Sequence, residues 1–205
     1  PLDDRNGTNS GASFVVFGGD FTGAATQVGT TDVDTLTGTA GKDILIGGTG
    51  ADTLVGSGGA DILRGGKGDD ILAISTNDFT RIEGGSGTDT LRLDGRGMSL
   101  DFRTIADNAI TEIEIIDLNA EGNSVSLDVL EVLRLSDSIN TVRILGDYTN
   151  TLSLSGFGWT TGTADTPAPQ VKEGGITFNV FSDGQAVIEV QQEVTRLGGP
   201  IAAVE

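Results

Sequence analysis

The sequence contains neither cysteine nor histidine among its 205 residues. The absence of cysteine excludes disulfide bonds, thiolate metal sites and cysteine nucleophiles. The absence of histidine removes the imidazole base used in acid–base catalysis and the usual ligand of zinc and iron. The metal ligands that remain are oxygen atoms, which are the ligands that calcium takes.

Basic residues are also scarce, because 12 lysine and arginine residues stand against 30 acidic ones, giving a net charge of −18 at pH 7. Binding of phosphate groups needs clustered basic side chains, so we expect no nucleic-acid partner. No run approaches the roughly 18 apolar residues of a membrane span, so we expect no membrane insertion. A net charge of this size destabilises a compact state unless cations neutralise it. No secretion signal opens the sequence at Pro1, and we expect a piece of a longer or processed protein.

Glycine is abundant, with 32 residues, and between residues 29 and 92 it recurs in a nine-residue pattern. Four consecutive nonapeptides fill residues 38–73: GTAGKDILI, GGTGADTLV, GSGGADILR and GGKGDDILA. A weaker copy, GTTDVDTLT, begins at Gly29, and another copy, GGSGTDTLR, begins at Gly84. Position one is always glycine, position six is always aspartate and position eight is always leucine. The aspartates are Asp34, Asp43, Asp52, Asp61, Asp70 and Asp89, and the leucines are Leu36, Leu45, Leu54, Leu63, Leu72 and Leu91.

Each nonapeptide combines a tight turn with a short strand. The glycine-rich first half reaches positive φ and permits close approach of backbones. The second half, Asp-x-Leu-x, alternates in the manner of a strand and sends leucine to one face. A single unit cannot bury its leucine alone, whereas stacked units form a continuous core. The stacked turns would then bring carbonyl oxygens and aspartate carboxylates to one edge, as calcium requires.

Two other interpretations of the repeat are a flexible glycine- and aspartate-rich linker and a metal-free solenoid. A linker has no physical reason to place leucine at the eighth position of every nonapeptide. A metal-free solenoid would stack neighbouring carboxylates without a counterion, which is unfavourable. We therefore favour a metal-binding solenoid.

Residues 29–92 carry the GGxGxDxUx pattern and resemble the RTX (repeats-in-toxin) family, whose fold is a parallel β-roll with two nonapeptides per turn. The resemblance implies calcium between repeats n and n+2, with the carboxylate pairs Asp34/Asp52, Asp43/Asp61, Asp52/Asp70 and Asp70/Asp89. It also implies carbonyl ligands at positions one and three, namely Gly38, Ala40, Gly47, Thr49, Gly56, Gly58, Gly65, Lys67, Gly84 and Ser86. The expected cofactor is Ca²⁺, with four ions, or five if residues 74–83 hold another. Those ten residues depart from the pattern, and Asp78 is the candidate partner left for Asp61.

Residues 1–28 form a separate N-terminal segment. Ser13 to Gly19 (SFVVFGG) is a compact apolar strand, preceded by Asn6 to Ala12 (NGTNSGA). The segment resembles the last strand of an FG-GAP repeat, the blade unit of integrin-like β-propellers. The alternative is a strand that covers the first turn of the roll.

Residues 93–205 are expected to form a mainly β C-terminal cap with one short helix, which makes the whole chain all-β. Strands are predicted at Ile110–Leu118, Thr141–Leu145 and Leu152–Leu154, a helix at Asp128–Leu135, and a hairpin over residues 176–190. The order of these motifs resembles the C-terminal part of type I-secreted RTX surface proteins and adhesins. Within the first strand, alternation places Glu112 and Glu114 on a solvated face and argues against a catalytic pair. Tyr148, Phe157 and Trp159 are expected to pack in this region and not to line a ligand pocket.

The resemblance implies a secreted or cell-surface, calcium-dependent folding module that serves adhesion or extracellular structure. One alternative is a subunit of a calcium-dependent surface layer or filament, because exposed strand edges can self-associate. Another is the C-terminal part of an RTX hydrolase. The sequence has no zinc-binding histidine motif and no G-x-S-x-G elbow, so we expect no enzyme activity in this chain. The expected partners are calcium, further copies of the chain, and a cell-surface or matrix component.

Overall fold

The computed structural model describes residues 25–136, 140–155, 170–173, 176–182, 185–191 and 195–197. The strand predicted at residues 13–19, with its FG-GAP resemblance, lies outside the described residues. The same is true of Phe157 and Trp159. Tyr148 is described and is 79% exposed, so the prediction that it packs in the C-terminal region is wrong.

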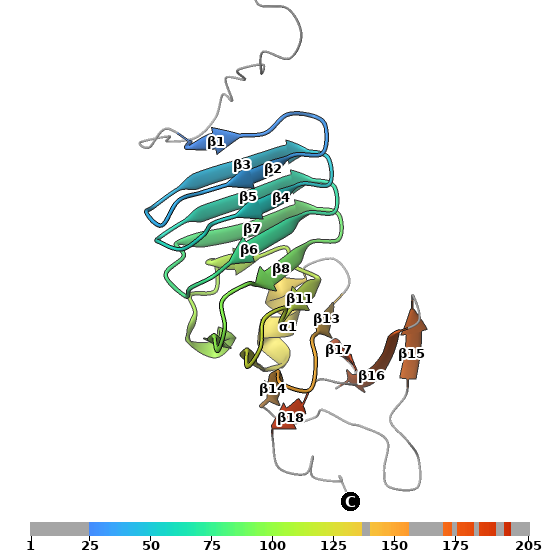
Figure 1. Cartoon of the computed structure of the whole chain (residues 1–205). Coiled ribbons are helices and arrows are strands. Elements are labelled where there is room, and N and C mark those ends of the chain that lie inside the picture. The colour runs from blue at the N-terminus through green and yellow to red at the C-terminus, as the bar shows by residue number, and fades with distance from the viewer. Residues whose placement is uncertain are drawn as a thin grey trace, which may run out of the picture.

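The nonapeptides form a parallel β-roll whose strands alternate between two sheets (Figure 1). The strands of the roll are β1 (Gln27–Val28), β2 (Thr35–Thr37), β3 (Ile44–Thr49), β4 (Thr53–Val55), β5 (Ile62–Lys67), β6 (Ile71–Ile74), β7 (Arg81–Ser86) and β8 (Thr90–Leu93). One sheet runs β1-β3-β5-β7 and the other β2-β4-β6-β8. Leu36 pairs with Leu54, and Leu45 with Leu63. Each turn therefore takes two nonapeptides, as the resemblance implied.

The leucine column forms the core of the roll. Along the strands, burial alternates, and inward-facing residues such as Leu54 and Leu63 are fully buried. Burying a leucine side chain stabilises the fold by about 1.5–3 kcal/mol. Because each leucine stacks directly on the leucine one turn away, this gain depends on neighbouring turns being present, as in other solenoids.

The irregular segment 74–83 is absorbed as one extra residue in a turn. Leu63 pairs with Ile82, and Leu72 with Leu91, so the register lengthens from 18 to 19 residues in both sheets. Ile82 takes the place of the missing leucine and is fully buried. The departure from the nonapeptide pattern therefore leaves the core continuous.

After β8 the coils become wider. The further elements are β9 (Ser99–Asp101), η1 (Phe102–Thr104), β10 (Ile110–Thr111), β11 (Ile115–Asp117), β12 (Ser124–Leu127), α1 (Val129–Leu135), β13 (Thr141–Leu145), β14 (Thr151–Leu154), β15 (Gln170–Glu173), β16 (Ile176–Ser182), β17 (Val187–Gln191) and β18 (Thr195–Leu197). The sheet of β2 continues from β8 through β11, β13 and β17, while β9, β12, β14 and β18 form a third sheet. The C-terminal region thus begins as a continuation of the solenoid (Figure 1).

Several C-terminal predictions are confirmed. Helix α1 begins where Asp128 accepts hydrogen bonds from the backbone N–H groups of Leu130 and Glu131, at 2.9 and 3.1 Å, which is N-capping. Strands β13 and β14 lie where they were expected, and β16 pairs with β17 in an antiparallel hairpin. No helix among the described residues is long and apolar enough to cross a membrane.

The segment predicted as a single strand, residues 110–118, is two strands in different sheets. β10 pairs with β7, whereas β11 pairs with β8. The chain turns a corner between them, where Glu112 has a positive φ of 58°. Ile113 and Glu114 are buried at this corner, with 0% and 7% of their surface exposed. The expected solvated face is therefore wrong for Glu114, because the corner rotates its side chain inward.

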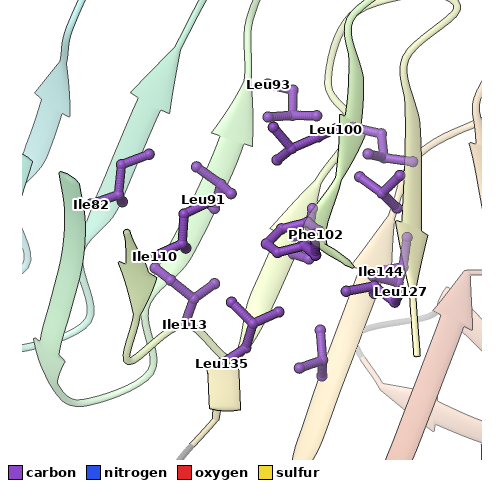
Figure 2. Close-up of a cluster of buried hydrophobic side chains, with 14 of the residues drawn as sticks. Ile82, Leu91, Leu93, Leu100, Phe102, Ile110, Ile113, Leu127, Leu135 and Ile144 are labelled. Atoms are coloured by element: carbon purple, nitrogen blue, oxygen red, sulfur yellow. The ribbon is translucent and has the colours of Figure 1, made fainter. Parts of the chain in front are cut away.

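The core runs without a break from the roll into the wider coils. Figure 2 shows Ile82 and Leu91 of the roll in one cluster with Ile110, Ile113 and Leu135 of the next coil. The backbone N–H of Ile113 also donates to the carbonyl of Leu135 at 2.8 Å. The corner at residues 112–114 is thus held between the last repeat and the end of α1.

Candidate metal centre

The turns of alternate repeats stack along two edges of the roll. The turns at residues 29–34, 47–52, 65–70 and 84–89 share one edge, which we call the long edge. The turns at 38–43 and 56–61 share the opposite, short edge. This division follows from the parallel register, since each strand pairs with the strand two repeats away.

Carboxylates form a hydrogen-bonded ladder along the long edge. The backbone N–H of Asp34 donates to Asp52 Oδ1 at 2.8 Å, and that of Asp52 donates to Asp70 Oδ1 at 2.7 Å. The N–H of Asp70 donates to Asp89 Oδ1 at 2.8 Å, and that of Asp89 to Glu114 Oε2 at 2.9 Å. We call these five residues the acidic ladder. The structure therefore brings together the three carboxylate pairs expected on this edge and adds Glu114.

The repeats differ in whether the second carboxylate oxygen, Oδ2, of the position-six aspartate has a hydrogen-bond partner. The Oδ2 atoms of Asp52, Asp70 and Asp89 are buried and have no hydrogen-bond partner. Buried polar atoms in folded proteins nearly always have a partner, and an orphan needs an explanation such as an ion. The three orphans occupy equivalent positions along one edge, and a cation bound at each position would give the carboxylate oxygen a partner.

Backbone carbonyl oxygens lie close to the orphaned Oδ2 atoms. A Cβ atom added to Gly47 would lie 2.6 Å from Asp52 Oδ2 and 2.6 Å from the carbonyl oxygen of Gly65. The same juxtaposition recurs one turn later, where Asp70 Oδ2 and the Gly84 carbonyl approach Gly65. Hard, anionic and carbonyl oxygens without nitrogen or sulfur are the donor set of calcium. The residues present therefore fit calcium.

In the first two repeats, which begin Gly-Thr, the threonine supplies hydrogen bonds to the aspartate Oδ2 atom. The N–H and hydroxyl of Thr30 both donate to Asp34 Oδ2, at 2.6 and 2.8 Å. Thr39 makes the same pair of bonds to Asp43 Oδ2, at 2.6 and 2.9 Å. The sequence pattern treats all six aspartates alike, whereas here threonine already satisfies the oxygen that is an orphan in the Gly-Gly repeats.

The carbonyls expected at position three accept backbone hydrogen bonds from the neighbouring turn. Lys67 O accepts from the N–H of Gly50, and Ser86 O from that of Gly68, both at 2.8 Å. Thr49 stands in register with Lys67. These carbonyls face the stacked turns, and each oxygen retains a second lone pair.

The short edge contains one carboxylate pair. The N–H of Asp43 donates to Asp61 Oδ1 at 2.9 Å. At Gly38, the carbonyl of Gly56 and Asp43 Oδ2 each lie 2.9 Å from an added Cβ. The other carbonyls expected on this edge belong to Ala40, which lies beside Gly59, and to Gly58, which lies beside Ser75 and Thr76.

Thr80 occupies the place opposite Asp61 in the next coil. Its N–H donates to the carbonyl of Asp61 at 2.7 Å, and the following residue, Arg81, pairs with Ile62. Asp78, the candidate partner, is exposed, and its N–H faces Thr76. The inserted residue moves Asp78 out of register, so the coil after Asp61 offers the Thr80 hydroxyl in place of a carboxylate.

Burial sets the electrostatics of the ladder. It raises the pKa of Asp70 to about 6 and that of Asp89 to about 7, with the adjacent carboxylates adding to the effect. Burial likewise raises the pKa of Asp61. At Asp43 the hydrogen bond from the Thr39 backbone lowers the pKa. Negative charge on the ladder is therefore most costly at Asp70 and Asp89.

Calcium-free protein is expected to gain β-sheet signal as the pH falls from 8 to 5. Asp70 and Asp89 hold a proton more tightly in the folded chain than in the unfolded one, where the pKa is near 3.8. Their protonation thus stabilises the fold at low pH, and this contribution is lost as pH rises through about 6 to 7. Far-UV circular dichroism of metal-stripped protein measures the change, and Asp89→Asn should weaken its pH dependence. A signal that is constant or that rises towards pH 8 would contradict the assignment.

The described part of the chain holds no group of three or more acidic side chains that could bind a metal by themselves. The oxygen donors that the long edge offers are pairs of carboxylates together with backbone carbonyls. That combination is the one that the stacked turns present at Gly47, Gly65 and Gly84.

Glu114 is the member of the acidic ladder that the sequence interpretation missed. It stands in register with Asp89, because Ile115 pairs with Thr90 and Ile116 with Leu91. The available signal was the order Glu-x-Ile at residues 114–116, which matches the Asp-x-Leu of a repeat. The strong alternation of residues 110–118 concealed it, since it suggested one uninterrupted strand.

Comparison with known proteins identifies the repeats. Residues 28–63 and 37–72 match the sequence model of the RTX calcium-binding nonapeptide repeat, which comprises four copies. No curated protein matches the chain. Among solved structures, the AlgE6R3 subunit of the Azotobacter vinelandii mannuronan C5-epimerase is 19% identical, over 95% of this chain and 94% of that chain, with a TM-score of 0.24. A score this low carries no structural argument, so the sequence match to the repeats carries the comparison.

Proposed function

We propose that this chain, an RTX calcium-binding protein with its nonapeptide repeats at residues 28–72, is the calcium-dependent folding module of a secreted bacterial surface protein. The observation that carries the proposal is the set of three buried Oδ2 atoms without a partner, on Asp52, Asp70 and Asp89. Each lies beside a backbone carbonyl of the next turn. A calcium ion at each point would supply the missing partner and offset two of the eighteen net negative charges.

The mechanism is linkage between binding and folding. The turns that hold the cation exist only in the folded roll, so calcium stabilises the folded state alone. Each site contributes about 2.7 kcal/mol when calcium is a hundredfold above its Kd. The three sites together would contribute about 8 kcal/mol, which is comparable with the whole stability of a typical domain, about 5–15 kcal/mol. The folded state of the roll therefore depends on calcium.

This dependence suits export. Extracellular calcium modules have Kd values of about 10⁻⁴–10⁻³ M, far above the calcium concentration in the cytosol. Inside the cell the chain would stay unfolded and could thread through a type I exporter. Outside the cell it would bind calcium and fold, and there it would serve adhesion or extracellular structure.

Asp70→Asn tests the proposal because Asp70 is shared by two neighbouring pairs of the acidic ladder. The variant is expected to bind two fewer calcium ions than the wild type in calorimetric titration of metal-stripped protein. Asp69→Asn is the matched control, since it makes the same change of charge at the adjacent, exposed residue. It is expected to bind the wild-type number. Equal stoichiometry in both variants would place the ions elsewhere and refute the proposed site.

A further inference from the structure

The acidic ladder continues for one coil beyond the last nonapeptide. The repeats end at residue 92, yet the N–H of Asp89 donates to Glu114 Oε2 at 2.9 Å. This bond repeats the arrangement of Asp52 with Asp70 and of Asp70 with Asp89. Glu114 is only 7% exposed, so the coil after the repeats presents a buried carboxylate at the ladder position.

The remaining donors of a repeat site are also present at this junction. Asp89 is fully buried, and its Oδ2 atom has no hydrogen-bond partner. The carbonyl oxygen of Glu112 meets Gly84 at the place where the carbonyl of Gly84 meets Gly65 one turn earlier. The positive φ of Glu112, 58°, belongs to the corner that presents this carbonyl. A corner of three residues thus replaces the six-residue turn of a nonapeptide.

We propose that Asp89 Oδ2, the Glu114 carboxylate and the Glu112 carbonyl hold a calcium ion between the last repeat and the first wide coil. The inference rests on the proposed function, because it extends the same oxygen chemistry to residues that no repeat pattern includes. Two carboxylates and a carbonyl, with no nitrogen or sulfur donor, favour calcium over transition metals. One face of this site is a nonapeptide turn and the other is not.

The junction site gives calcium control over the C-terminal coils as well as the roll. The corner that carries Glu112 and Glu114 also carries Ile113, whose N–H donates to Leu135 at the end of α1. Figure 2 shows Ile113 and Leu135 in the same cluster as Leu91 of the last repeat. A cation bound on one side of the corner therefore orders a segment whose other side packs on the helix.

The ladder ends in the following coil. Ile115 pairs with Arg143 and Ile116 with Ile144, so the residue opposite Glu114 is Val142. Valine offers no side-chain oxygen, and Val142 is fully buried in the apolar core. Within the described part of the chain, the junction site is therefore the last position on this edge at which two carboxylates face each other.

Glu114→Gln tests the inference, because glutamine keeps an oxygen for the Asp89 N–H and removes the charge. Calorimetric titration of the metal-stripped full chain with calcium is expected to show one bound ion fewer than the wild type. Glu121→Gln is the matched control, with the same chemical change at an exposed side chain of the same coil. It is expected to bind the wild-type number. The wild-type number in Glu114→Gln would overturn the inference.

A second measurement uses the wild type, so that its result does not depend on whether the variant folds. In the wild type, the amide resonances of Asp89 and Ile115 are expected to shift during calcium titration followed by ¹⁵N nuclear magnetic resonance. If the Asp52 amide shifts while those two do not, the junction site is absent although the roll binds calcium. If no calcium binds to the wild type at all, the proposed function itself fails. The two failures are therefore distinguishable.

Discussion

Metal-stripped protein at pH 8 is expected to lack most of its β-sheet structure and to recover it cooperatively when calcium is added. Without the cation, the ladder stacks buried carboxylates at successive turns and leaves three of their oxygens without partners. Each such orphan costs about 1–3 kcal/mol, and the repulsion between neighbouring charges adds to this cost. These penalties fall on a core whose leucines are buried only while the turns stay stacked.

Far-UV circular dichroism during a calcium titration measures this transition, with calorimetry to count the ions. Magnesium at the same concentration is the control, because it demands near-ideal octahedral geometry and retains several of its waters. It is expected to restore much less structure. A complete β-sheet spectrum in chelator at pH 8 would contradict the linkage mechanism. The roll would then be a metal-independent scaffold.

The second large effect is expected from Gly66→Ala in calcium-saturated protein. Gly66 has a φ of 116°, and an added Cβ would strike the backbone carbonyl of Gly48 in the preceding turn. Backbone strain in this region costs an L-residue about 1–2 kcal/mol, and overpacking against an unyielding neighbour costs about 1–3 kcal/mol more. We therefore expect a loss of about 3 kcal/mol or more in the free energy of unfolding.

Gly97→Ala separates the two contributions. Gly97 also has a positive φ, 66°, but an added Cβ would meet nothing within 4 Å. This variant should lose only the cost of the backbone conformation, about 1–2 kcal/mol. Urea unfolding of both variants at one calcium concentration measures the difference. Equal losses would show that the turns on the long edge can separate to admit a side chain, contrary to their close stacking.

The recurring columns of the sequence predicted the roll because they encode it locally. Aspartate at position six and leucine at position eight recur at a spacing that only a stacked fold can use, as with Asp52 and Leu54. The register of Leu45 with Leu63 then follows from two repeats per turn. The α1 helix and the β16–β17 hairpin were predictable for the same reason, since capping and turn residues act over a few positions.

The candidate site was predictable only in part. The pairing of Asp52 with Asp70 follows from the resemblance to the RTX family. The hydrogen bonds from threonine hydroxyls to Asp34 and Asp43 depend on where each hydroxyl lies within its turn. The loss of Asp78 from the short edge depends on where the turn absorbs one extra residue. Each feature depends on the geometry of a single turn, which the repeat pattern does not specify.

By itself the sequence determined the oxygen-only chemistry, the excess of negative charge and the nine-residue period of the repeats. Those properties reside in composition and in spacing, which do not depend on long-range contacts. Only the tertiary structure decided that Glu114 belongs with Asp89. The alternation of residues 110–118 is compatible with a straight strand, and the packing of Ile113 against the end of α1 bends the chain there. A corner produced by a contact distant in sequence leaves no periodic signal.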